Sequence, residues 1–263
     1  RERFEAANPN AATGSRIWGV YWSRPQVLAR QHPRIDAVRR FLNRLWTLDA
    51  PGGPWLDPDH DIAYPDRVRR REPGATSRGL AMHVDTQMAG GWRIPENQRV
   101  LAPLLTGGLA AFDPWNPAHR TGVEPESAVG GTVFRTFQGW TALSAMHPSD
   151  GVLHIAPIPV AAAYRAVVGL AGELGVDGDP RPAPVRDAGD DLVARALTPI
   201  PEVAPGDTVW WHGDLFHSVA DASNDVRWGN VMYIGASPRC PRNDRYRDGA
   251  LERFVREIGR AHV

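Results

Sequence analysis

Two histidine–aspartate pairs, each with one residue in between, are the side chains of this sequence best suited to bind a metal ion. They are His83-Val84-Asp85 and His212-Gly213-Asp214. From the His and Asp content, about 0.7 such pairs are expected by chance, so the spacing alone does not identify a site. In an extended segment, residues two apart project from the same face of a sheet, so such a pair can supply two neighbouring ligands.

A third ligand candidate far downstream, His217, favours the first pair. Two histidines and one carboxylate form the facial triad of non-haem iron(II) oxygenases, which leaves coordination positions open for cosubstrate and dioxygen. His217 lies in a second strand-like segment that can fold back across a barrel. We therefore predict that His83, Asp85 and His217 bind iron(II) and form the catalytic centre.

The other pair has a simpler interpretation. We expect His212 to pack beside the neighbouring tryptophans Trp210 and Trp211, with Asp214 in a turn after Gly213. A role in orienting the metal ligands is the minor alternative.

An arginine ten positions after His217 suggests a cosubstrate. 2-Oxoglutarate carries a remote carboxylate, and the planar fork of arginine can bind both of its oxygens. Arg227 begins the next predicted strand, where hairpin geometry would bring it beside His217. Gln138 and Thr141 are further candidates to hydrogen-bond the cosubstrate's carboxylates. Because strand alternation puts these two on opposite faces, at most one is expected to do so, and we favour Gln138.

Other chemically suggestive residues have plainer interpretations. The basic run Arg67 to Arg71 is expected to be a solvated face, although it would predict an anionic substrate if it bordered the pocket. Asp59-His60-Asp61, after Pro58, is expected to form a capped turn, and His154 to be a core histidine. Trp92 and Trp115 could line a substrate mouth.

Composition excludes several classes of function. The chain has zero formal net charge, so neither nucleic acid nor a membrane surface is an expected partner. It contains no lysine, which P-loop ATPases and pyridoxal phosphate enzymes require. Its single cysteine, Cys240, cannot form internal disulfides or a cysteine-rich metal site. With neither an apolar run long enough to span a bilayer nor a secretory signal, we expect a cytoplasmic protein.

The elements that would position these residues are mainly strands. The hydrophobic periodicity predicts three helices and six strands, with no β-α-β rhythm. The predicted helices are 34–46, 160–174 and 249–258, and the predicted strands are 79–86, 132–143, 151–157, 208–212, 215–219 and 228–236. We expect one domain over 1–263, mainly β with flanking helices, whose core is a double-stranded β-helix, a jelly-roll of the cupin type. Its helical N-terminal part, about 1–55, is expected to pack on that core.

Several segments also resemble known families. The stretch from Pro205 to Ser218 is similar to the distal-histidine segment of the phytanoyl-CoA dioxygenase-like oxygenases. The stretch from Phe134 to Ser144, followed by 151–157, resembles another region of that superfamily, although its terminal Gly-Ser-His is replaced by Ile158-Pro159-Val160.

Nearly the whole chain resembles the YbiU-like family, through 19–23, 57–61, 64–67, 134–143 and 230–234. This resemblance implies a double-stranded β-helix that uses Fe(II) and 2-oxoglutarate. Succinate and CO2 would be coproducts, and the substrate a small-molecule metabolite. A carboxylate at Asp85 favours hydroxylation over halogenation. Since family members are longer at the N-terminus and this chain starts at Arg1, we expect it to be an excerpt.

Two other functions use the same residues. A zinc or manganese enzyme of the cupin type, an isomerase or hydrolase, would need the three ligands but leaves Arg227 unexplained. A jelly-roll binding module would use the histidines only as structural residues. The sequence specifies neither the substrate nor the oligomeric state.

Overall fold

The structure, a computed structural model, describes residues 16–18, 23–64, 66–75, 79–86, 95–120, 133–173, 189–221 and 227–261. Eleven strands, six α-helices and two short 3-10 helices lie in these ranges. In chain order they are β1 (Arg16–Trp18), α2 (Arg24–Arg30), α3 (Pro33–Asn43), β2 (Asp57–Asp61), β3 (Val68–Arg70), β4 (Leu80–His83), α4 (Pro95–Gly107), η3 (Leu109–Ala111), η4 (Pro117–His119), β5 (Phe137–Ala142), β6 (Leu153–Ile155), α5 (Ala161–Glu173), α6 (Gly189–Ala196), β7 (Thr198–Pro199), β8 (Thr208–His212), β9 (His217–Val219), β10 (Val231–Ala236), β11 (Pro238–Arg239) and α7 (Pro241–Ala261).

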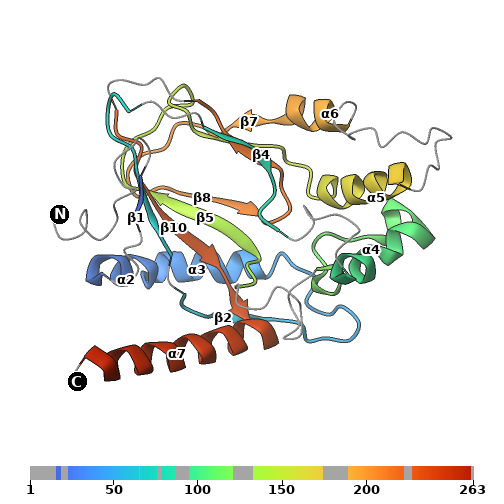
Figure 1. The fold of residues 1–263 in the computed structure, drawn as a ribbon, viewed down its shortest axis with the longest axis horizontal. Coiled ribbons are helices and arrows are strands. Elements are labelled where there is room, and N and C mark those ends of the chain that lie inside the picture. Colours follow the sequence, from blue (N-terminus) through green and yellow to red (C-terminus); the bar gives the residue numbers. More distant parts are fainter. Residues whose placement is uncertain are drawn as a thin grey trace.

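Two antiparallel sheets make up the centre of the molecule (Figure 1). The larger has the strand order β1-β3-β10-β5-β8, and the smaller has the order β4-β9-β6-β7. A further two-stranded sheet joins β11 to β2. The two main sheets do not join into a closed barrel in the described part of the chain, so the structure establishes a mainly β architecture with flanking helices.

In the larger sheet, the pairing register places side chains from four neighbouring strands on the same face. Val231 of β10 lies opposite Arg69 of β3, and Tyr233 lies opposite Trp140 of β5. Gln138 of β5 lies opposite Trp211 of β8. Because side chains two apart in a strand share a face, these rows form one surface. That surface faces the smaller sheet, because residues of both sheets line one cavity.

Helices cover the opposite face of the larger sheet. Helix α3 runs beneath β10 and β5 in Figure 1, with α7 further below. A buried cluster joins Leu42 of α3 and the following Trp46 to Phe137 of β5 and Ala236 of β10. The guanidinium of Arg39 donates to the Gly235 carbonyl oxygen at 2.9 Å. These contacts fix the sheet on its helical side and leave its other face free for a site.

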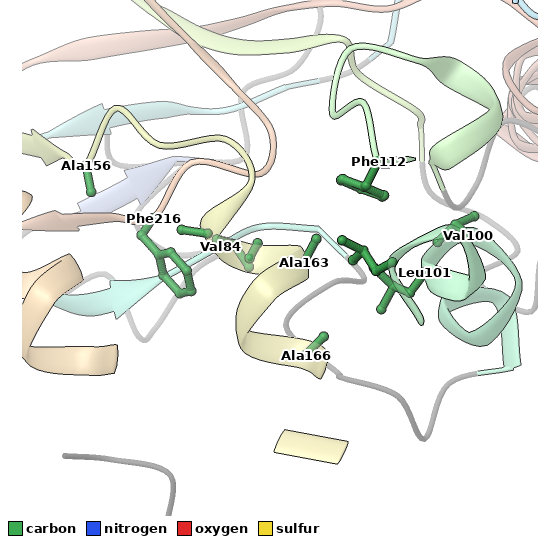
Figure 2. Close-up of a cluster of buried hydrophobic side chains, with 11 residues drawn as sticks. Val84, Val100, Leu101, Phe112, Ala156, Ala163, Ala166 and Phe216 are labelled. Atoms are coloured by element: carbon green, nitrogen blue, oxygen red, sulfur yellow. The ribbon is translucent and has the colours of Figure 1, made fainter. Parts of the chain in front are cut away.

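A second buried cluster packs beside the smaller sheet, and Figure 2 shows it in close-up. Val84 and Phe216 contribute to this cluster together with Leu101 of α4 and Ala163 of α5. Val84 stands between His83 and Asp85 in the chain, and Phe216 directly precedes His217. Since neighbouring side chains alternate in direction along extended backbone, the burial of Val84 and Phe216 directs the histidines and the aspartate to the other side.

The predicted helices are confirmed, with α3, α5 and α7 occupying the predicted places. Helix α7 is longer than predicted and begins at Pro241 rather than at 249. Each of the six predicted strands contains an observed strand. The segment 175–184, whose Gly, Asp and Pro residues predict a surface loop, lies outside the described residues. No helix among the described residues is both long and apolar enough to cross a membrane.

Two segments were predicted wrongly. Asp59-His60-Asp61, expected to form a capped turn, belongs to strand β2, which pairs with β11. Part of the basic run expected to be a solvated face is strand β3, which lies between β1 and β10. In both cases, backbone pairing with a distant segment outweighs the low strand propensity of charged residues.

Candidate metal site and cavity

Three side chains of the predicted triad converge at the edge of the smaller sheet. The ligand atoms of His83, Asp85 and His217 all lie within 4.8 Å of one another. Asp85 Oδ1 lies 3.4 Å from His83 Nε2, and Asp85 Oδ2 lies 3.4 Å from His217 Nε2. Two ligands bound at right angles to one ion, with bonds of about 2.1 Å, are separated by about 3 Å. The spacing therefore suits a single metal ion held by all three.

Strand pairing accounts for this convergence. His83 of β4 and His217 of β9 are directly opposite each other in the antiparallel ladder. Their rings are 4.3 Å apart between centroids. The register shifts between Leu80 and His83, which indicates an extra residue in β4, and such bulges redirect side chains near functional sites. Asp85, two residues beyond His83, returns to the same side of the chain.

Backbone carbonyls orient both imidazole rings. His83 Nδ1 lies 2.7 Å from the Ala81 carbonyl oxygen, and His217 Nδ1 lies 3.0 Å from that of Leu215. A carbonyl can only accept, so each Nδ1 carries the proton and donates it. With Nδ1 occupied in this way, Nε2 is the nitrogen that faces Asp85 and the one that each histidine can offer to a metal ion.

The Asp85 carboxylate is also held by a residue of the larger sheet. The side-chain amide of Gln138 donates to Asp85 Oδ2 at 2.7 Å. Burial acts to raise the pKa of Asp85, but the hydrogen bond and charge of His217, together with the charges of His83 and Arg135, outweigh it and hold the pKa below its ordinary value. The side chain is 34 % exposed, whereas that of His217 is 5 % exposed. The cluster of His83, Asp85 and His217 therefore has an ionised carboxylate on its solvent-exposed side.

A cavity of about 360 Å³ extends from this group into the space between the two sheets. A volume of this size is in the range of small-molecule sites. Its wall combines the three ligand residues with aromatic, aliphatic and a few polar side chains. The lining residues are Arg69, Gly79, Leu80, His83, Asp85, Gln138, Trp140, Met146, Val152, Leu153, Trp211, His217, Val219, Val231 and Tyr233.

Two buried N–H groups belong to residues of this wall and lack a hydrogen-bond partner. They are Arg69 Nε and Trp211 Nε1. A buried donor without an acceptor costs about 1–3 kcal/mol, so a native protein rarely leaves one unused. Tyr233 lines the same cavity; burial raises its pKa against the opposing charge of Arg69, which keeps the phenol protonated. The cavity thus offers cationic and neutral donors to a ligand rich in acceptors.

Arg227 lies elsewhere than predicted. Its guanidinium forms two hydrogen bonds, of 2.8 and 2.7 Å, with the carboxylate of Asp150. The Arg227 side chain is 47 % exposed, and it does not line the cavity. The prediction assumed that a hairpin after His217 would return Arg227 to its side. The buried carboxylate of Asp150 instead holds it at another turn.

The remaining predicted residues divide between the site and the core. Gln138 lies in the cavity wall beside Asp85, whereas Thr141 is not a lining residue. Trp115, proposed for a substrate mouth, instead packs against Trp46 and Phe137. Trp92 lies outside the described residues. His154 pairs with Ser218 in the smaller sheet and is not part of the metal-binding group.

Arg69 was predicted only as a member of its basic run, although strand alternation separates it from its neighbours. In the run Arg67 to Arg71, a strand centred on Arg69 sends that side chain to one face and its neighbours to the other. Arg70 lies on the far side, with its guanidinium 4.7 Å from the Trp228 ring. Arg71 is buried and donates to the carbonyl oxygens of Asp150 and Gly151. The four arginines of this run therefore do not form one solvated face: Arg69 lines the cavity, Arg70 contacts Trp228 and Arg71 is buried.

The second His-x-Asp pair is buried and contributes no ligand. His212 stacks on Trp46 with ring centroids 5.0 Å apart, as the prediction of a packed histidine requires. The Asp214 amide donates to His212 Nδ1, so Nε2 carries the proton and donates to the Pro114 carbonyl oxygen at 3.2 Å. Asp214 forms a buried ion pair with Arg120. Both ring nitrogens and the carboxylate are thus already bonded within the protein.

Comparison with known proteins places the chain among relatives of similar fold. The protein YbiU of Escherichia coli K12 is 46 % identical over 244 residues, which are 90 % of this chain and 58 % of YbiU. The predicted resemblance to YbiU is thereby confirmed, and this chain spans about three-fifths of the length of that relative.

Solved structures agree with this relationship. A hypothetical protein of Escherichia coli, JW0805, has a TM-score of 0.77 at 45 % identity over 92 % of this chain and 61 % of its own. A Salmonella typhimurium LT2 protein called "Putative Oxidoreductase" has a TM-score of 0.74 at 44 % identity, over 89 % of this chain and 58 % of its own. GlcNAc Inducible Gene 2 of Candida albicans has a TM-score of 0.64 at 25 % identity, over 88 % of this chain and 54 % of its own.

The family match covers most of the chain. The Gig2-like family matches residues 2–170 and 191–259, which include every residue of the candidate metal site and the cavity wall. The chain therefore belongs to the Gig2-like family.

Proposed function

We propose that this protein is an Fe(II)- and 2-oxoglutarate-dependent oxygenase that hydroxylates a small molecule. The observation that carries the proposal is the convergence of two histidine Nε2 atoms and one carboxylate on a cavity whose wall also includes Arg69. Two histidines and a carboxylate are the ligand set of non-haem iron(II) oxygenases. In this proposal, the two antiparallel sheets are the halves of an open double-stranded β-helix.

The residues of the site suit both Fe(II) and 2-oxoglutarate. His83, Asp85 and His217 would hold iron on one side and leave the cavity side open. Arg69, rather than Arg227, would bind the remote carboxylate of 2-oxoglutarate, because Arg69 lines the cavity and its Nε has no hydrogen-bond partner in the protein. The indole N–H of Trp211 is a second such donor.

The bound groups would supply the oxidation: one dioxygen inserts an oxygen atom into a C–H bond of the substrate, while 2-oxoglutarate loses CO2 and becomes succinate. The chain's own residues bind and orient. The carbonyls of Ala81 and Leu215 fix the two imidazole rings, and Gln138 fixes one carboxylate oxygen of Asp85. Apolar wall residues such as Val152 exclude water from the reacting atoms.

A non-oxidative zinc or manganese enzyme with the same three ligands is the competing hypothesis. It gives no role to the unpartnered N–H groups of Arg69 and Trp211, which a diacid cosubstrate would use. The name of the Salmonella relative also favours redox chemistry.

The test is anaerobic addition of Fe(II) and 2-oxoglutarate to the purified protein. We expect a weak visible metal-to-ligand charge-transfer band, which His217→Ala abolishes. His154→Ala is a matched control, because His154 lies in the adjacent strand β6 of the same sheet but outside the ligand group. A band that is absent from the wild type, or that survives in His217→Ala, would refute the proposal.

The cosubstrate assignment has its own test. Arg69→Met should raise the dissociation constant of 2-oxoglutarate about 10- to 100-fold, the value of a hydrogen bond to a charged group. Arg70→Met is the control, because Arg70 belongs to the same strand but contacts Trp228 and Glu72. Equal 2-oxoglutarate affinity in the two variants would exclude Arg69 as the anchor.

A further inference from the structure

A buried ion pair lies beside the two chain segments that carry the metal ligands. The side chains of Arg120 and Asp214 are 3 % and 2 % exposed, respectively. Burial lowers the pKa of Arg120 to about 9, which still leaves the guanidinium charged near neutral pH. Removing two charges from water costs several kcal/mol per ion, so such a pair is weak as a stabilising device. Its position suggests another role.

Asp214 connects the two segments directly. It belongs to the turn between β8 and β9, three residues before His217. While one carboxylate oxygen contacts Arg120, the other accepts a hydrogen bond of 2.6 Å from the hydroxyl of Thr86. Thr86 is the residue directly after Asp85. The bond therefore joins the neighbour of one ligand to the turn that leads to another.

The backbone at Asp85 needs such a restraint. Strand β4 ends at His83, so Asp85 lies beyond the ladder that pairs β4 with β9. The turn approaches closely at Gly213, where a Cβ atom would lie 3.0 Å from Thr86 Cγ2. Glycine thus permits the contact between the turn and Thr86.

The turn that contains Asp214 is also held by contacts on the side away from Thr86. The Asp214 amide donates to His212 Nδ1 at 3.1 Å, and the His212 ring stacks on Trp46. The guanidinium of Arg120 lies over the same Trp46 ring, 5.7 Å from its centroid. Asp214 is accordingly held by a packed aromatic group while it holds Thr86.

We propose that Asp214, neutralised by Arg120, is a positioning residue that sets the Asp85 carboxylate relative to His217 through Thr86. The proposal rests on the metal site proposed above and adds the element that fixes its geometry. Arg120, Asp214 and Thr86 are not among the three candidate metal ligands. Their effect is on the distance and direction between ligands, on which metal affinity depends.

The test compares the Fe(II) affinity of three threonine variants, measured anaerobically by calorimetry with Fe(II) alone. Thr86→Val removes the hydroxyl and should raise the Fe(II) dissociation constant about 10- to 100-fold. Thr86→Ser keeps the hydroxyl and should restore near wild-type affinity. Thr136→Val is the matched control, because Thr136 donates a bond of the same 2.6 Å length to Asn43, away from the ligands. Wild-type affinity in Thr86→Val would overturn the proposal.

A second measurement separates this proposal from the proposed function. If the wild type binds no Fe(II), the proposed function fails, and the positioning role is judged on the metal-free protein by hydrogen–deuterium exchange. Thr86→Val should then speed amide exchange in peptides covering 80–86 and 213–219, and Thr136→Val should not. Unchanged exchange in Thr86→Val would refute the positioning role independently of any metal.

Discussion

The two His-x-Asp pairs of this chain share residue types and spacing but not chemistry. His83 and Asp85 leave an imidazole Nε2 and carboxylate oxygens facing a cavity. His212 and Asp214 have their polar atoms bonded to other protein groups. A donor atom can serve a ligand only if the fold has not already used it. What separates the pairs is therefore the set of partners that the fold brings to each.

The largest expected effect follows from exchanging the carboxylates of the two pairs for amides. Asp214→Asn should destabilise the protein by about 3–5 kcal/mol, because it leaves the charge of Arg120 buried without its partner. Asp85→Asn should change the free energy of unfolding by less than about 1 kcal/mol, because Asp85 is exposed and asparagine keeps an oxygen that can accept from Gln138. Chemical denaturation of the metal-free variants measures both. A similar decrease in the free energy of unfolding in both variants would contradict the distinction between a structural carboxylate, Asp214, and a ligand carboxylate, Asp85.

An intermediate effect concerns the buried histidine. Burial, with the added charge of Arg120, lowers the pKa of His212 from 6.5 to about 3, although the Pro114 carbonyl opposes the shift. Between pH 6.5 and about pH 3, His212 is protonated in the unfolded chain but not in the folded protein. The free energy of unfolding should therefore fall as the pH drops below about 6.5, by up to about 1.4 kcal/mol per pH unit from this residue.

Substitution of that histidine isolates its contribution. The stability difference between the wild type and His212→Asn should narrow by about 2 kcal/mol between pH 7.5 and pH 5, because asparagine does not titrate. Urea denaturation of both proteins in matched buffers provides the measurement. A difference that stays constant over this range would show that His212 is not held neutral by the fold.

Local pattern predicted the elements better than their partners. The helix at 34–46 and the strand at 208–212 have clear periodicity, and both are present. Strand β2 is rich in Asp and was not predicted, because its pairing with β11 is a contact between distant segments. Such pairing has no local signature, so charged strands are interpreted as turns until the sheet is known.

The same limit applies to the site. The order and residue types of His83, Asp85 and His217 were enough to predict that they meet. Which arginine lines the cavity was not predictable in this way, because that depends on which strands pair with one another in the sheet. Arg69 enters the cavity wall since β3 pairs with β10, where it lies opposite Val231. Arg227 is closer to His217 in sequence, yet a buried aspartate holds it at another turn.

The smallest expected effect concerns Arg69 and Arg227, which differ in whether the protein already provides an acceptor for the guanidinium. Arg227 already has an acceptor, and its hydrogen bonds are the largest cause of the lowered pKa of Asp150, whereas Arg69 Nε has none. Arg227→Met should therefore leave the dissociation constant of 2-oxoglutarate within about twofold of the wild type, a change near 0.4 kcal/mol. Equilibrium titration alongside Arg69→Met provides the measurement. If Arg227→Met weakened 2-oxoglutarate binding tenfold or more, Arg227 would have to leave Asp150 and enter the cavity when the ligand binds, and the distinction between used and unused donors would fail for this pair.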